Sequence, residues 1–167
     1  MNDRATFIGR DTLRIVRYLP GPLERVWSYL TEPALLAKWF SAGEVADHVG
    51  GDVCFEIGAS GSITAYERLR LIEFTWNEEE SSHGPVVDAL VRWELAEEGD
   101  RVRLTLTHAR LPANELAPHA AGWHTFLERL EDWMRGREPV PVRERFQQLR
   151  NIYEATGPNS GENPECL

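Results

Sequence analysis

The sequence predicts an α+β fold in which a curved antiparallel sheet of about six to seven strands wraps around one long C-terminal helix. Alternating apolar and polar residues, the pattern of half-buried strands, dominate residues 43–109. Residues 115–135 instead repeat their apolar positions at helical spacing, over about 30 Å, which is enough to cross a whole sheet. Because the strands are grouped and do not alternate with helices, the order indicates an α+β fold.

The N-terminal part predicts one strand followed by two short helices. Residues 12–19 alternate in the period of a strand, and residues 20–22, Pro-Gly-Pro, end it. Residues 23–30 carry apolar side chains at helical spacing. Residues 31–33, Thr-Glu-Pro, are typical of a new helix start with proline in the first turn, and residues 34–40 form the second helix.

The middle of the chain predicts a run of strands separated by turns. The strand-like segments are residues 53–58, 62–69, 71–76, 86–95 and 101–111. Residues 50–52 and 60–61 have the glycine content of hairpin turns. The polar, acidic loop 77–85 is long enough to act as a lid. Clean alternation from Val102 to His108 favours an antiparallel sheet with one face covered and one face in water.

The C-terminal part predicts the long helix, a linker and a weaker helix. Gly136 is placed to end the helix of residues 115–135. The sequence predicts a linker over residues 137–141 and a short amphipathic helix over residues 142–154. The tail 156–167 is rich in Gly, Pro and Asn, so we expect it to be disordered.

The composition excludes several classes of function. The chain has 167 residues and a net charge of −9, which argues against general binding to nucleic-acid phosphates. No apolar run approaches the roughly 20 residues of a membrane span. The two cysteines, Cys54 and Cys166, do not form a disulfide framework. We therefore expect a cytoplasmic protein that neither binds nucleic acid nor inserts into membranes.

The sequence carries no motif for a metal, a nucleotide cofactor or a nucleophile. His119 and His124 are five residues apart, which places them on different faces of a helix. Cys54 alternates with the inward-facing Val53 and Phe55, so we expect an outward, inert thiol. Glycine-rich phosphate loops and the Gly-x-Ser-x-Gly turn are absent from the sequence. The prediction is no metal and no cofactor.

Two polar side chains share the inward face of predicted strands. His108 extends an apolar stripe, where it could hydrogen-bond a ligand or act as an acid or base. The alternative is a structural histidine satisfied by a backbone group or by the facing helix. Arg17 lies two and four residues after Ile15 and Leu13, so it should point to the same inward face of the strand. There it could anchor an anionic head group or form an ion pair with an acidic residue of a neighbouring strand.

Tryptophans are numerous, with six in the chain. Trp76 and Trp93 each lie two residues from an apolar strand residue, so strand alternation predicts that both face inward. Trp39 and Trp123 lie on predicted helices, where they could line a pocket or simply pack in the core. The surplus of inward aromatic rings favours an aromatic-lined interior.

Four segments together resemble the START/Bet-v-1-like helix-grip superfamily, also called SRPBCC. The segments are residues 17–40, 71–76, 104–112 and 119–134. Within the superfamily they resemble the branch named for the C-terminal domain of the activator of heat-shock-protein-90 ATPase. The resemblance implies a helix-grip domain over residues 1–136 with a deep, mostly apolar cavity, and it leaves residues 137–167 as an extension.

The resemblance further implies binding of a small hydrophobic molecule between the sheet and the long helix. The candidate ligand-binding residues are Arg17, Trp39, Phe55, Tyr66, Trp76, Trp93, Leu106, His108, Trp123, Leu127 and Leu130. One alternative is a co-chaperone-like module or a homodimer, which would use the outer face of the sheet or an apolar stripe on residues 142–154. The other is an enzyme that uses the same cavity with His108 as acid or base; the binding role is preferred because of the surplus of inward aromatic side chains.

Overall fold

The computed structural model describes residues 3–158, which form one eight-stranded sheet and four α-helices. The strands are β1 (Thr6–Ile8), β2 (Thr12–Pro20), β3 (Gly43–Val45), β4 (Asp52–Phe55), β5 (Ala59–Glu67), β6 (Leu71–Glu78), β7 (Val86–Glu98) and β8 (Arg101–Ala109). The helices are α1 (Leu23–Thr31), α2 (Pro33–Trp39), α3 (Leu116–Met134) and α4 (Val142–Thr156), with a 3₁₀ turn, η1 (Ala113–Glu115), before α3.

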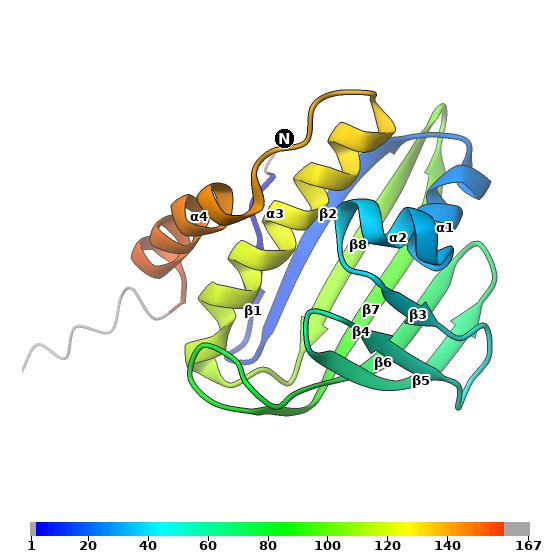
Figure 1. Cartoon of the computed structure of the whole chain (residues 1–167). Helices are drawn as coiled ribbons and strands as arrows, with labels where there is room; N and C mark the ends of the chain where they lie inside the picture. The colour runs from blue at the N-terminus through cyan, green and yellow to red at the C-terminus, as the bar shows by residue number, and fades with distance from the viewer. Residues whose placement is uncertain (1–2, 159–167) are drawn as a thin grey trace, which may run out of the picture.

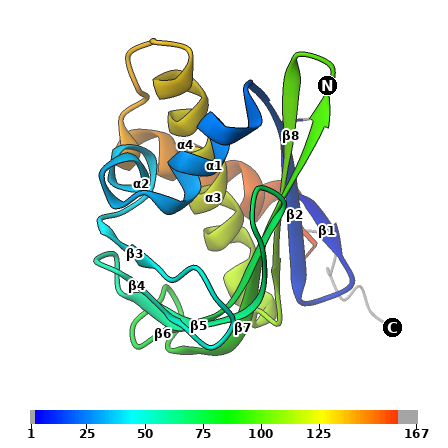
Figure 2. The same ribbon diagram turned by 90° about the vertical axis from the view of Figure 1, so that its right-hand side faces the viewer.

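The sheet is antiparallel throughout and curves around α3. Its strand order is β1-β2-β8-β7-β6-β5-β4-β3, so the sheet begins and ends with a three-residue strand. Helix α3 crosses the concave face of the sheet (Figure 1). Figure 2 shows α1 and α2 beside one end of α3, on the same side of the sheet. This is the predicted helix-grip arrangement, with eight strands among the described residues where the sequence indicated six or seven.

The sheet differs from the prediction at its short strands and at one turn. β1 and β3 have three residues each, too few to show an alternating pattern. The predicted turn at residues 60–61 is wrong, because both residues lie within β5 and the chain turns instead at Gly58, whose φ is 105°. Gly61 serves close packing: a Cβ there would lie 1.8 Å from the carbonyl oxygen of Thr75.

The buried face of the sheet follows directly from strand alternation. Ile15 of β2 lies opposite Leu106 of β8, and Leu106 lies opposite Trp93 of β7. All three side chains are fully buried. Their neighbours in sequence point to the opposite, more exposed face, as the period of two requires.

Helix boundaries follow local sequence signals. Pro33 lies in the first turn of α2, as predicted, but the helix spans Pro33–Trp39 where residues 34–40 were expected, and Glu32 rather than Thr31 occupies the N-cap position. Gly136 follows the end of α3 with φ 68°, and its N–H donates to the carbonyl of Trp133 at 3.2 Å. A left-handed residue at this position satisfies carbonyls that the helix leaves free, which is why glycine suits it.

Helix α4 packs along α3 and the N-terminal segment (Figure 1). Leu149 and Tyr153 are each 2% exposed. The Tyr153 hydroxyl accepts the N–H of Ala5 at 2.7 Å and hydrogen-bonds His124 Nδ1 at 2.7 Å. The apolar stripe expected to serve as an interaction surface is therefore mostly used inside the molecule. The predicted tail lies, from residue 159 onward, outside the described residues.

Candidate functional site

Aromatic rings fill the space between the sheet and α3. Phe40, directly after α2, lies at the centre of this cluster. Its ring centroid is 5.0 Å from that of Trp123 and 4.9 Å from that of Phe55. Trp39 and Trp93 approach to 6.0 Å on the inner side. The deep apolar cavity implied by the resemblance is thus largely occupied by side chains, since bulky rings from both layers meet at its centre.

A smaller pocket of about 220 Å³ remains at the outer edge of this cluster, and we refer to it as the aromatic pocket. Its walls come from β6, the β6–β7 loop, α3, α4 and the residues after α2 and β4. They are Phe40, Ile57, Trp76, Glu78, Glu80, Ser81, Ser82, Pro118, His119, Gly122, Trp123, Phe126 and Phe146. The lining combines aromatic rings with a few polar groups, the usual character of a small-molecule site.

Both tryptophans of the aromatic pocket are fixed through their indole N–H groups. Trp76 Nε1–H donates to Glu78 Oε1 at 2.7 Å, and Trp123 Nε1–H donates to His108 Nδ1 at 2.9 Å. The two rings lie 5.4 Å apart at a tilted angle. A buried indole with a satisfied N–H has little rotamer freedom, so these rings form preorganised walls.

His108 lies directly behind the aromatic pocket, fully buried. Its ring is 5.2 Å from the rings of both Trp76 and His119. Burial, with the nearby charge of His119, holds the pKa of His108 well below its usual range, so the ring is neutral. Because Nδ1 accepts from Trp123, the proton is on Nε2, which has no hydrogen-bond partner among residues 3–158.

His119 on the first turns of α3 is a charged element of the pocket wall. Its Nδ1 contacts the carbonyl and carboxylate of Glu115, at 2.8 Å and 3.2 Å, and its Nε2 lies 3.3 Å from Glu78 Oε1. Burial lowers the pKa of His119, but the hydrogen bonds to the two carboxylates outweigh it and raise the pKa to about 9. His119 is therefore an imidazolium at neutral pH.

Glu115 connects this charge to the β6–β7 loop. Its carboxylate, on a residue that is 1% exposed, accepts the Ser81 hydroxyl at 2.8 Å and the His83 N–H at 2.6 Å. Burial raises the pKa of Glu115, yet the hydrogen bonds from His119, Ser81 and His83 lower it to about 2. The loop that the sequence indicated as a lid is thereby anchored to the start of α3, where Ser81 and Ser82 form part of the pocket wall.

The structure brings only some of the sequence-predicted residues to this site. Trp76 and Trp123 line the aromatic pocket, and His108 stands behind them. Six others are core residues with at most 2% exposure: Trp39, Phe55, Trp93, Leu106, Leu127 and Leu130. Tyr66 is partly buried against Trp27 of α1, with ring centroids 5.8 Å apart, and lies outside the pocket wall.

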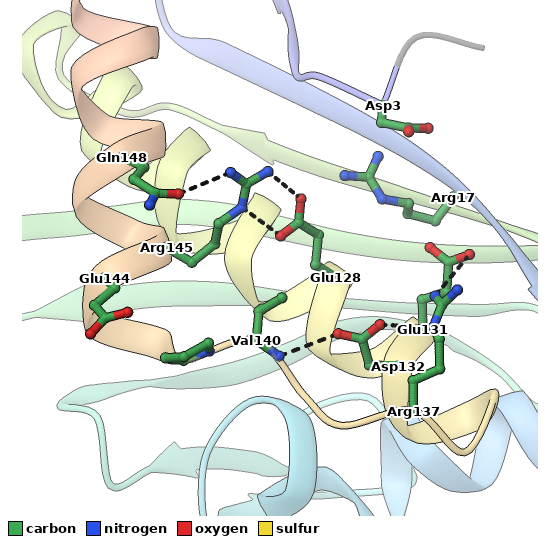
Figure 3. A pocket seen from close by; sticks show the side chains of 11 residues that line it. Asp3, Arg17, Glu128, Glu131, Asp132, Arg137, Val140, Glu144, Arg145 and Gln148 are labelled. Carbon is green, nitrogen blue, oxygen red and sulfur yellow. Dashed lines mark hydrogen bonds and ion pairs between the residues drawn. The ribbon is translucent and has the colours of Figure 1, made fainter.

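Arg17 belongs to a different, polar pocket of about 490 Å³ between β2, α3 and α4 (Figure 3). The side chain points inward as its parity indicated and is 3% exposed. The expected ion pair with a neighbouring strand is wrong: among the described residues no carboxylate lies within 4 Å of the guanidinium, whose Nη1 donates to the carbonyl of Val16 at 3.2 Å. The carboxylates that act on its charge are those of Asp3, before β1, and of Glu128 and Glu131 on α3.

Sequence reasoning missed several wall residues. In the sequence, Phe126 and Phe146 occupy ordinary apolar positions of helices, and Gly122 shows no feature that indicates a pocket. His119 could have been found, because Glu115 precedes it by four residues, which is one helical turn.

Within residues 3–158 there is no cluster of three or more His, Cys, Asp or Glu side chains that could hold a metal ion. Cys54 points outward and is exposed, as alternation predicted, while Val53 and Phe55 are buried.

Comparisons with known proteins identify the relatives of this chain. A family model described as Activator of Hsp90 ATPase homolog 1-like protein matches residues 20–135. The protein encoded by gene BPP1335 from Bordetella parapertussis, solved by solution NMR, is 26% identical with a TM-score of 0.74, over 93% of this chain and 91% of that chain. The crystal structure of CalU16 from Micromonospora echinospora is 26% identical with a TM-score of 0.73, over 91% and 93% of the two chains.

A more distant likeness concerns the fold alone. PFC0360w, described as an HSP90 activator from Plasmodium falciparum, is 20% identical with a TM-score of 0.64, over 77% of this chain and 98% of that chain. No curated protein sequence matches this chain.

Proposed function

The chain belongs to the Activator of Hsp90 ATPase homolog 1-like family of the helix-grip superfamily, and from that membership we propose that it binds a small hydrophobic molecule in the aromatic pocket. One observation carries the proposal: the rings of Trp76, Trp123, Phe126 and Phe146 converge on a single hollow. Burying a ligand against such rings is worth about 25 cal/mol for each Å² of apolar surface removed from water, before the cost of association.

Most of the binding site comes from the helix-grip domain, which we take as residues 1–136. Helix α4, in the extension that follows residue 136, reaches the pocket through Phe146. The family match ends at residue 135, so Phe146 lies outside the shared domain. The extension therefore supplies a wall that the domain alone does not have.

An enzymatic use of the same site receives less support. A general base needs a free lone pair, but the lone pair of His108 Nδ1 is engaged by Trp123 and the unpartnered Nε2 carries the proton. His119 has both ring nitrogens engaged by Glu115 and Glu78. Neither histidine is poised to accept a proton from a substrate.

A protein-interaction role is the remaining alternative. The likeness to an Hsp90 activator is at the level of fold, and the α4 stripe expected to bind a partner is packed against α3. The proposal includes a cytoplasmic location, which the two-cysteine composition supports. No helix within residues 3–158 is both long and apolar enough to cross a membrane.

A substitution at Gly122 tests the proposed function without disturbing the core. A Cβ at Gly122 would meet only Phe146 Cε2, at 3.9 Å, so there is room for a side chain to enter the pocket. In Gly122→Leu the added atoms fill the hollow, whereas Gly122→Ala leaves most of it open. Both substitutions favour the helix, since glycine in a helix interior is unfavourable by about 1 kcal/mol relative to alanine.

Calorimetric titration with naphthalen-2-ylmethanol, a neutral two-ring probe, compares the three proteins. We expect the wild type and Gly122→Ala to bind similarly and Gly122→Leu to bind at least about tenfold more weakly. Native mass spectrometry of the same proteins then tests whether a co-purifying small molecule disappears in Gly122→Leu. Equal binding by all three proteins, or binding by none of them, would contradict the proposal.

A further inference from the structure

The polar groups of the aromatic pocket constrain the charge of what it binds. The pocket is small for a ligand site, since such sites usually span about 300–1,000 Å³, whereas this one measures about 220 Å³. That size suits one compact ring system rather than a long lipid chain. What distinguishes ring systems of that size from one another is the charge of their substituents.

The pocket offers no free cationic donor. Among the described residues, no lysine or arginine lines it, and His119 is its one cationic group. Both nitrogens of His119 are already engaged, by Glu115 on one side and Glu78 on the other. The indole N–H groups of Trp76 and Trp123 are likewise engaged inside the protein. A carboxylate ligand would find its charge without a strong partner.

Negative charge exceeds positive charge around the same hollow. Glu78 and Glu80 line it, and Glu115 lies directly behind His119, so the surroundings of the pocket hold three carboxylates and one imidazolium. Glu78 is occupied by Trp76 and His119. Glu80 is exposed and makes no hydrogen bond or ion pair with any other described residue, so its carboxylate is available to a ligand.

The aromatic walls add to this preference. Tryptophan and phenylalanine rings carry negative charge density on their faces, and they attract cations when water is excluded. Trp76, Trp123, Phe126 and Phe146 all border the hollow. Several rings with a free carboxylate at the rim form the combination that binds alkylammonium groups.

We propose that the aromatic pocket selects compact aromatic or apolar molecules that carry a positive charge, a protonated amine or a quaternary ammonium, over carboxylates of the same shape. This inference rests on the proposed function and names its ligand class. Rings contact the apolar body of the ligand, and Glu80 with the ring faces stabilises its cationic group. Because Glu80 is exposed, its share of the selectivity falls with increasing salt.

Three probes of one shape test the inference on the full-length protein. They are naphthalen-2-ylmethylamine, a cation at neutral pH; naphthalen-2-ylmethanol, which is neutral; and naphthalene-2-carboxylate, an anion. Binding is followed by the indole N–H signals of Trp76 and Trp123 in ¹H–¹⁵N NMR spectra, assigned with single Trp→Phe variants. We expect the amine to bind about fivefold to tenfold more tightly than the carboxylate at low salt.

Two charge-neutralising variants show where the preference arises. Glu80→Gln should bring the amine and the alcohol to within about twofold of each other. Glu24→Gln, an equal change in net charge on the exposed face of α1, should leave the amine preference intact. A selectivity that responds equally to both variants would overturn the role of Glu80.

The outcomes separate this inference from the proposed function. A carboxylate that binds as tightly as the amine overturns the cation preference, while binding of any probe at these indoles still supports the pocket as a ligand site. Binding of none of the three probes overturns both proposals. A preference for the amine that Glu80→Gln removes supports both.

Discussion

His119 links the stability of the molecule to pH through two carboxylates. Its imidazolium lies between Glu115 and Glu78, with the side chain 9% exposed. The pKa of His119 in the folded protein, about 9, exceeds its ordinary value of 6.5. The stabilisation is therefore complete below about pH 6.5 and is lost as the pH rises through 9.

We predict that the free energy of unfolding falls by up to about 3 kcal/mol between pH 6.5 and 9.5, because that is the upper limit set by the shift in the pKa of His119. Urea unfolding across this range measures the fall, and the difference from His119→Gln isolates it. His48→Gln, at a histidine whose side chain is 69% exposed, is the matched control and should follow the wild type. A His119→Gln profile parallel to the wild-type profile would refute the link.

A second residue-scale prediction concerns Gly61. In Gly61→Ala the new methyl would lie 1.8 Å from the Thr75 carbonyl oxygen, so β5 and β6 must move apart. We expect a loss of about 1–3 kcal/mol in the free energy of unfolding. The same substitution at Gly122 meets ordinary contact at 3.9 Å and should be neutral or stabilising. Chemical denaturation of both variants tests the contrast, and similar losses for the two would contradict it.

Strand alternation predicts which face of the sheet a side chain takes, but only tertiary structure determines which residues it contacts. The inward positions of His108, Trp93 and Arg17 follow from strand parity, which a sequence displays. The residues that these side chains contact cannot be predicted from strand alternation. Arg17 faces α3 and α4 in a separate polar pocket because the angle between helix and sheet sets what each inward residue meets. Pattern alone carries no information about that angle.

At the scale of elements, the β6–β7 loop depends on one buried carboxylate. Glu115 in η1 accepts the Ser81 hydroxyl and the His83 N–H and also holds His119. Removing a buried acceptor leaves its donors unpaired, at a cost of about 3–5 kcal/mol for a buried charged partner. The order of the β6–β7 loop therefore depends on the hydrogen bonds that Glu115 accepts from Ser81 and His83.

We predict that Glu115→Ala frees the loop and lowers global stability. Hydrogen–deuterium exchange of peptides spanning residues 79–85 should become at least tenfold faster, because the His83 N–H loses its acceptor. Glu80→Ala, in the same loop but exposed and unpaired, should leave the exchange rate unchanged. Unchanged exchange in Glu115→Ala would show that other contacts hold the loop.

Elements that show more than one full period of their pattern were predictable, and the three-residue strands were not. The 19-residue α3 and the nine-residue β8 show several full periods of their patterns, and both were placed within a few residues. β1 and β3, with three residues each, offer about one period. The start of β5 was misplaced because a glycine needed for close strand packing looks the same in sequence as a glycine needed for a turn.

For the molecule as a whole, α4 completes the fold rather than extending from it. Leu149 and Tyr153 are buried, and Arg145 pairs with Glu128 of α3 through two hydrogen bonds of 2.8 Å and 2.7 Å. Phe146 also closes one side of the aromatic pocket. The helix thus contributes to both stability and the proposed site.

We predict that a chain ending at Arg137 unfolds at a lower denaturant concentration than the full-length chain. Burial of Leu149 and Tyr153 is worth about 1.5–3 kcal/mol each, so the loss should amount to several kcal/mol. Guanidinium unfolding and size-exclusion chromatography are the measurements. Phe146→Ala in the full-length chain is the companion variant, expected to widen the pocket with a smaller effect on stability. A truncated chain that remains monomeric and equally stable would contradict the account.

The global architecture was predictable, while the filling of the interior was not. Grouped strands, two short helices and one long helix specify the helix-grip arrangement, and the family match confirms it. The sequence also showed a surplus of aromatic residues. Whether those rings line a large cavity or fill it depends on how they meet across the layers, as Phe40 does with Trp123 and Phe55.

The two short edge strands bear on how the protein behaves when it is concentrated. β1 and β3 bound the sheet, and each has three residues. A neighbouring molecule adding a strand to β1 or to β3 could form few backbone hydrogen bonds with it, too few to offset the loss of freedom on association. Strand addition at β1 and at β3 is therefore disfavoured, so we expect native molecules not to associate through these two strands.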